Sequence, residues 1–174
     1  ADCPSCPAGS VCPSLAALSP EPCPEGFFCP AGVSIPTQCP VATYCPVNSI
    51  IPTTCPAGHY CPFNASAAPI VCPPSRFCPQ GTVVPGECNV GYFSIPDIAT
   101  TTRDSQSSLC ALCPPGTYSS VPGSAGCLPC DAGHVCLGGT PISNPTDPDQ
   151  HNGYVCREGR FCPEGSSEEV PCAP

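Results

Sequence analysis

The sequence contains no tryptophan, no methionine and no lysine, and its aromatic residues are only five Tyr and six Phe. A chain this poor in large apolar side chains cannot bury a conventional hydrophobic core. No apolar run approaches the roughly 18 residues that a membrane-spanning helix needs, so we expect no membrane insertion. Four Arg against thirteen acidic residues give a net charge of −9. This charge repels phosphate backbones and argues against a nucleic-acid partner.

Cysteine is abundant instead. Twenty of the 174 residues are cysteine, which is above the roughly 8–10% at which a short chain indicates a disulfide scaffold. Thiols at this density indicate an oxidising compartment, so we expect a secreted protein in an extracellular or cell-surface location. We interpret the start at Ala1 and Asp2, rather than Met, as a sign that a signal peptide has been removed. With 29 Pro and 16 Gly, crosslinks must replace the missing apolar burial.

Pairs of cysteines separated by five residues recur along the chain and define an internal repeat. In the regular part, the first cysteines of successive pairs lie 16 or 17 residues apart. The pairs are Cys6 and Cys12, Cys23 and Cys29, Cys39 and Cys45, Cys55 and Cys61, Cys72 and Cys78, Cys130 and Cys136, and Cys156 and Cys162. Cys88 and Cys113 open units that lack the second cysteine, so nine repeats can be laid out.

Two positions in each repeat carry residues that are typical of turns. Three residues after the first cysteine stands Gly9, Gly26, Gly58, Gly91, Gly116, Gly133 or Gly159, with Ala42 and Ser75 as exceptions. Three residues after the second cysteine stands Gly32, Asn48, Asn64, Gly81, Gly139 or Gly165. Glycine and asparagine tolerate a positive φ, so we expect two turns per repeat. An aromatic or valine residue directly precedes the second cysteine place, where we expect it to cover the disulfide.

The pattern predicts a small disulfide-rich fold. We expect an elongated, solenoid-like rod of short 16–17-residue cystine repeats, with tiny β-hairpins and turns and essentially no helix. The expected segments are a regular array over 1–93, a polar interruption over 94–109, a CxxC module over 110–136, an irregular loop over 137–155 and a final repeat over 156–174.

Two regular disulfide arrangements fit the spacing. In the first, bridges join neighbouring repeats: Cys12 to Cys23, Cys29 to Cys39, Cys45 to Cys55, Cys61 to Cys72, Cys78 to Cys88, Cys136 to Cys156 and Cys162 to Cys172, with Cys113 to Cys127 inside the CxxC module. In the second, the five-residue pairs are bridged internally, Cys88 takes Cys110, Cys113 takes Cys127, and Cys3 is left with Cys172. In both arrangements, cysteines near the ends of the chain are left without a partner that fits the regular pattern. Cys3, Cys6 and Cys172 are therefore possible contacts between copies joined head to tail, with a Cys3 to Cys6 bridge as the simpler alternative.

The pattern Cys-Pro-x-Gly-x-aromatic resembles the ephrin-receptor-like cysteine-rich modules, which are relatives of tumour-necrosis-factor-receptor repeats. The stretch that carries the likeness is CALCPPGTYSSVPGSAGCLPCDAGHVC, from Cys110 to Cys136. Tandem units such as CPAGHYCP, from Cys55 to Pro62, are similar to arrays in surface proteins of protists and algae. The resemblance implies a spacer, an adhesive stalk or a ligand-binding ectodomain. Most units here carry an extra cysteine after the aromatic, and the period is shorter, so no receptor ligand is carried over.

The sequence also contains CxxC motifs, histidines and an acidic segment, which are residue types found in redox, catalytic and metal sites. We interpret the CxxC motifs at Cys3, Cys110 and Cys127 as structural cystines rather than redox dithiols or a zinc ribbon. The histidines His59, His134 and His151 form no evident catalytic dyad. Asp147, Asp149 and Asn152 before Gly153 only loosely resemble a calcium loop, since a bidentate Glu is absent. We therefore expect no metal and no cofactor.

Asn64-Ala65-Ser66 is an acceptor sequon for N-linked glycosylation. The repeat places Asn64 at the second turn, where a glycan can project into solvent. We expect Asn64 to be glycosylated.

These observations predict an extracellular structural protein that is not an enzyme. The expected role is a repeating subunit or segment of a fibre, stalk or surface coat, with self-association head to tail. The alternative is a ligand-binding or adhesive ectodomain that uses the two irregular stretches, 94–108 and 137–155, on a rigid support.

Overall fold

The computed structural model describes residues 6–13, 19–96, 99 and 103–172. The chain forms two compact units. The first contains residues 1–72 and 78–85, and the second contains residues 73–77 and 86–174. We number the repeats one to nine by their first cysteines, which are Cys6, Cys23, Cys39, Cys55, Cys72, Cys88, Cys113, Cys130 and Cys156.

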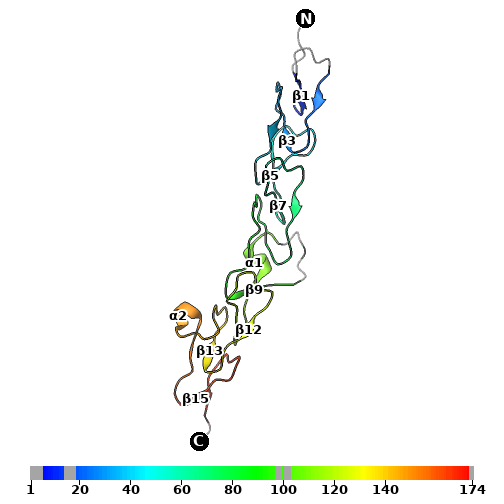
Figure 1. Ribbon diagram of the computed structural model, residues 1–174. Coiled ribbons are helices and arrows are strands. Elements are labelled where there is room, and N and C mark those ends of the chain that lie inside the picture. The colour runs from blue at the N-terminus through cyan, green and yellow to red at the C-terminus, as the bar shows by residue number, and fades with distance from the viewer. Residues whose placement is uncertain (1–5, 14–18, 97–98, 100–102, 173–174) are drawn as a thin grey trace. The chain divides into compact units, whose positions relative to one another are not determined.

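The first unit is a succession of two-stranded antiparallel hairpins, one per repeat (Figure 1). In each hairpin, the residues just before the second cysteine pair with the residues just before the next first cysteine. The pairs are β1 (Ser10–Val11) with β2 (Glu21–Pro22), β3 (Phe27–Phe28) with β4 (Thr37–Gln38), β5 (Thr43–Tyr44) with β6 (Thr53–Thr54), and β7 (His59–Tyr60) with β8 (Ile70–Val71).

The second unit repeats this plan with two insertions. An isolated bridge joins Phe77 to Gly86. The hairpins are β9 (Tyr92–Ser94) with β10 (Cys110–Leu112), β11 (Thr117–Tyr118) with β12 (Leu128–Pro129), β13 (His134–Cys136) with β14 (Gly153–Val155), and β15 (Arg160–Phe161) with β16 (Val170–Pro171). Two four-residue helices, α1 (Gln106–Leu109) and α2 (Pro148–His151), lie in the insertions. The small disulfide-rich repeat fold is therefore confirmed, and helix in the described ranges is confined to these two places.

The turn predicted after each first cysteine is present in all nine repeats. All seven glycines at this position have positive φ, from 74° to 85°. The two exceptions adopt the same conformation, with φ 67° at Ala42 and 58° at Ser75. The place in the repeat, rather than the residue type, therefore determines the backbone conformation.

The second turn differs from the prediction in the fourth repeat. Asn48 has φ 65°, as expected, but Ala65 rather than Asn64 has the positive φ, at 57°. The cause is one additional residue between Cys61 and Cys72, because ten residues separate these cysteines where nine separate Cys45 and Cys55. The extra residue moves the turn one position along the chain.

Cysteine forms most of the buried core. Among the described residues, the buried hydrophobic side chains other than cysteine are Val11, Leu109 and Val135, whereas most first and second cysteines are 0–1% exposed. One cluster packs Phe27 and Val33 against Val11 and the Cys23–Cys29 bridge. A second packs Leu109 and Tyr92 against the Cys88–Cys110 bridge. The residues predicted to cover the disulfides are mostly half-buried or buried, but Phe161 in the ninth repeat is 59% exposed.

Candidate functional site

Nine disulfides contain every described cysteine except Cys172. They are Cys6–Cys12, Cys23–Cys29, Cys39–Cys45, Cys55–Cys61, Cys72–Cys78, Cys88–Cys110, Cys113–Cys127, Cys130–Cys136 and Cys156–Cys162. Of the two arrangements considered from the sequence, the one that bridges neighbouring repeats is therefore wrong, apart from Cys113–Cys127. The positive-φ turn reverses the chain between the two cysteines of a repeat, which brings their Cα atoms to within about 6 Å, the usual separation in a cystine.

The cysteines at the two ends have different positions. Cys6 is bridged to Cys12, so it is not free to bond another copy. Cys172 carries an exposed free thiol. Cys3 lies outside the described residues.

Neighbouring repeats are joined by main-chain hydrogen bonds rather than by disulfides. The same four bonds recur in the four successive interfaces of the first unit and in the three of the second. The N–H of the residue at the first turn of one repeat donates to the carbonyl at the second-cysteine position of the following repeat. The carbonyl of the same turn residue accepts from the N–H of the first cysteine of the following repeat. Between the second and third repeats the four bonds are Gly26 N–H to Cys45 O, Cys39 N–H to Gly26 O, Cys29 N–H to Ser49 O and Asn48 N–H to Cys23 O, all 2.8–2.9 Å long. We call this set the four-bond ladder.

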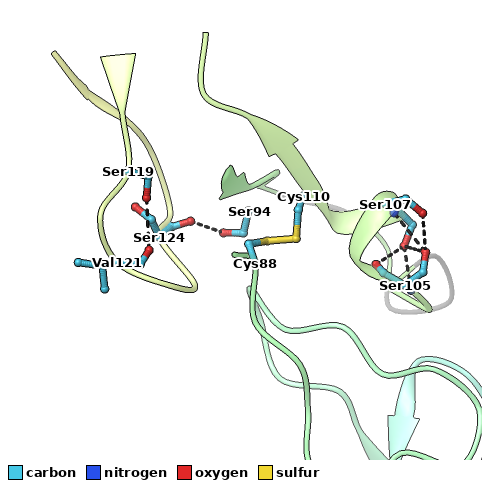
Figure 2. Close-up of a disulfide and its surroundings, with 9 residues drawn as sticks. Cys88, Ser94, Ser105, Ser107, Cys110, Ser119, Val121 and Ser124 are labelled. Carbon is cyan, nitrogen blue, oxygen red and sulfur yellow. Dashed lines mark hydrogen bonds between the residues drawn. A yellow bond between two sulfur atoms is a disulfide. The ribbon is translucent and has the colours of Figure 1, made fainter. Parts of the chain in front are cut away.

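Two places in the ladder accept more than one type of residue. Ala42 makes the same two bonds as the turn glycines, at 3.0 Å to Cys61 O and 2.9 Å from Cys55 N–H. In the sixth and seventh repeats, the buried Ser94 and Ser119 stand in the place of the second cysteine and keep its main-chain bonds. Their hydroxyls donate to Ser124 O and Val121 O at 3.3 Å (Figure 2).

Contacts also reach across two repeats. A Cβ added at Gly26 would overlap the carbonyl of Ala65, which belongs to the second turn two repeats further on. Gly116 has the same relation to the carbonyl of Gly165. Glycine at these positions therefore gives the positive φ and also leaves space for another part of the main chain.

The insertion over 94–109 packs against its neighbours where the structure describes it. Ser105 caps α1 by accepting from the N–H of Ser108 at 3.3 Å, and the Ser108 hydroxyl accepts in return from the N–H of Ser105 at 3.2 Å (Figure 2). This capping box starts the helix whose last residue, Leu109, is buried beside the Cys88–Cys110 bridge. The guanidinium of Arg103 donates to Pro73 O at 2.9 Å.

The insertion over 137–155 is less irregular than the sequence indicated. Thr140 and Pro145 are fully buried, and the Thr140 hydroxyl donates to Asn152 O at 3.0 Å. Asp147, one of the residues of the calcium alternative, instead caps α2 by accepting from the N–H groups of Asp149 and Gln150. Across the part of the chain that the structure describes, no group of three or more His, Cys, Asp or Glu side chains could hold a metal ion.

The CxxC motifs within the described residues contain no dithiol. Cys110 bonds Cys88 while Cys113 bonds Cys127, so each motif divides its two cysteines between different bridges. Cys130 likewise bonds Cys136. The cysteines of 110–130 are therefore unavailable as zinc ligands.

The sequon in the fourth repeat is accessible. Asn64 is exposed, and its Oδ1 accepts from the N–H of Val41 at 3.1 Å. This bond leaves Nδ2, the atom that carries an N-linked glycan, without a hydrogen-bond partner among the described residues. The Ser66 hydroxyl donates to Phe63 O at 2.8 Å.

No helix among the described residues has the length and apolar character required to cross a membrane. No family model matches the chain, and no curated protein matches it.

Proposed function

We propose that this chain is an extracellular structural protein, a repeating subunit or segment of a fibre, stalk or surface coat. The observation that carries the proposal is the four-bond ladder, which recurs in seven interfaces. Because it uses main-chain atoms, repeats of varied sequence can follow one another through the same interface. A structural role needs this property, since it allows an array to be extended.

The disulfides support the extracellular part of the proposal. Nine bridges indicate an oxidising environment, because reducing cytosolic conditions would open most of them. A secreted or cell-surface location follows as part of the same proposal. The proposal includes no catalytic activity. Every described cysteine except Cys172 lies in a disulfide, so these cysteines have no free thiol to act as a nucleophile.

Head-to-tail association of copies belongs to the proposal. Since Cys6 is bridged, Cys172 and Cys3 are the remaining candidates for a covalent link between copies. The resemblance to tandem cysteine-rich arrays of surface proteins supports this reading as an analogy of sequence pattern.

Negative-stain electron microscopy of native, non-reduced protein tests the structural role. We expect regular filaments or extended arrays whose abundance rises with protein concentration. Reduced and alkylated protein is the control and should form none. A native protein that stays monomeric at every concentration and binds a specific partner would contradict the proposal and favour a ligand-binding ectodomain.

Glycosylation of Asn64 is a second expected property of an extracellular chain. In a eukaryotic secretory host, we expect a glycan whose mass is lost in both Asn64→Gln and Ser66→Ala. The two variants are matched, because Ser66→Ala removes the sequon but keeps the Asn64 to Val41 hydrogen bond, worth about 0.5–1.5 kcal/mol. Peptide mass spectrometry after glycosidase treatment measures occupancy. An unmodified Asn64 in the wild-type peptide would refute this expectation.

A further inference from the structure

Hydrogen bonding divides the described threonine hydroxyls into two groups. In the first group, the hydroxyl donates to a main-chain carbonyl and the residue is half-buried or buried. Thr43, Thr82 and Thr117 donate to the carbonyl of the proline three residues earlier at 2.6–2.7 Å, and Thr140 donates to a carbonyl at 3.0 Å. In the second group, the residue is exposed and its hydroxyl has no hydrogen-bond partner among the described residues. Its members are Thr37, Thr53, Thr54 and Thr146.

Three of the free hydroxyls lie on the second strands of two hairpins. Thr37 belongs to β4, and Thr53 and Thr54 form β6; both residues of each strand are exposed. Each of these sheets has two strands, so β4 and β6 have one edge without a neighbouring strand. A proline, Pro36 or Pro52, directly precedes each strand and fixes φ at its entrance. The three hydroxyls are therefore held on extended backbone that an enzyme can reach from solvent.

The fourth free hydroxyl is in a different setting. Thr146 lies in the loop before α2, between the fully buried Pro145 and the helix cap Asp147. It is not on a strand, so the argument below concerns β4 and β6.

The surface around β4 and β6 lacks the charges that protect many exposed strand edges. Residues 26–75 contain no Asp, Glu, Lys or Arg. Ile35 and Ile51 lie two residues before Thr37 and Thr53 and are 77% and 68% exposed. Charged side chains on an edge are one means by which proteins prevent pairing between exposed strands. A bulky polar group attached to the threonines would serve the same purpose here.

We propose that Thr37, Thr53 and Thr54 are acceptor sites for O-linked glycosylation. Oγ1 forms a bond to the anomeric carbon of a sugar, while the bond between that carbon and the phosphate of an activated donor breaks. The donor is a sugar carried on a nucleoside diphosphate or a lipid phosphate. The carrier leaves with its phosphate, and the hydroxyl proton passes to a base of the transferase. Extracellular stalks rich in Ser, Thr and Pro carry such sugars.

The free state of the three hydroxyls is the observation that carries this proposal. A sugar carbon must come to about 3–3.5 Å from Oγ1 before reaction. At Thr37, Thr53 and Thr54 this approach breaks no hydrogen bond of the fold, whereas at Thr43 the bond to Pro40 O must open first. The inference rests on the proposed extracellular location and adds a surface modification to it.

Peptide mass spectrometry tests the sites in full-length protein secreted from a eukaryotic host. Electron-transfer fragmentation keeps a sugar on its side chain and so identifies the modified residue. We expect the modified fraction at Thr37 and at Thr53 or Thr54 to exceed that at Thr43 by about tenfold or more, because the Thr43 hydroxyl is hydrogen-bonded. Thr43 is a matched control, since it lies directly opposite Thr54 in the same hairpin.

The mass of the intact protein gives a second measurement. Thr53→Val combined with Thr54→Val should remove the mass of the sugars on β6. The fold tolerates aliphatic residues at these two places, because Ile70 and Val71 occupy them in β8. Thr43→Val is the control and should leave the sugar mass unchanged.

The N-linked glycan of Asn64 separates a failure of this inference from a failure of the proposed location. Protein that carries the Asn64 glycan but no sugar on Thr37, Thr53 or Thr54 would overturn the acceptor sites and leave the extracellular location standing. Equal modification of Thr43 and Thr53 would also overturn the inference, because it would show that the free hydroxyl is not what selects the site. Protein without a glycan at either kind of site would contradict both.

Discussion

Reduction of the nine disulfides is expected to unfold the whole chain at room temperature. The reason is that cysteine supplies most of the buried side chains, and the other buried apolar side chains among the described residues are Val11, Leu109, Val135 and Pro145. A native bridge in a small secreted domain contributes about 2–5 kcal/mol, and the total stability of a domain is about 5–15 kcal/mol. The free energy lost with a few bridges is therefore larger than the whole free energy of unfolding. Circular dichroism and proteolysis before and after reduction measure the effect.

Cys172 provides the control within the same chain. Its thiol is exposed and unbridged, so alkylation without reductant modifies it and leaves the nine bridges intact. We expect this treatment to leave the spectrum and the resistance to protease unchanged. A reduced chain that retained its hydrogen-exchange protection would show that apolar packing, rather than crosslinking, maintains the fold.

Gly116→Ala should lower the stability of the second unit much more than Gly133→Ala. Both glycines have φ +85° and occupy the same place in successive repeats, so both variants carry the same backbone cost of about 1–3 kcal/mol. Only the methyl group at position 116 overlaps the carbonyl of Gly165. Overpacking of this kind costs about 1–3 kcal/mol more.

Thermal melting of the two variants at low protein concentration measures this difference. Gly126→Ala serves as the reference for an exposed site, because a Cβ at Gly126 meets nothing within 4 Å. Equal melting temperatures for Gly116→Ala and Gly133→Ala would show that the contact across two repeats contributes nothing to stability.

The sequence predicted the backbone conformation well where residue type and position agree. Glycine three residues after a first cysteine indicated a left-handed turn, and each of the seven has it. Ala42 and Ser75 were treated as exceptions because their side chains do not favour positive φ. The structure shows that both have the positive φ. Ala42 makes the same two ladder bonds as the turn glycines, and each of the two turns lies inside a loop closed by a disulfide, Cys39–Cys45 and Cys72–Cys78.

The disulfide pairing could not be obtained in this way. Bridges within repeats and bridges between repeats both follow the period of the cysteines, so spacing alone cannot separate them. The choice depends on how tightly the turn returns the chain on itself, which is a three-dimensional property. Asn64 shows the same limit on a smaller scale, because one extra residue moved the positive φ to Ala65 without any change of residue type to indicate it.

The interface between repeats left no signal in the sequence at all. The four-bond ladder connects main-chain groups, which every residue other than proline carries, so no side-chain pattern marks it.

Each disulfide stays within one repeat, and this has a mechanical consequence. When tension is applied along the chain, no crosslink between described repeats shares the load with the main chain, so the ladders must resist it. A repeat that detaches releases only the residues outside its bridge, such as the nine from 30 to 38, or about 30 Å of chain. The loop closed by each cystine cannot extend. The first four repeats have nine or ten residues outside each bridge, so they should lengthen under force in short steps of similar size, each reversible when the force is removed.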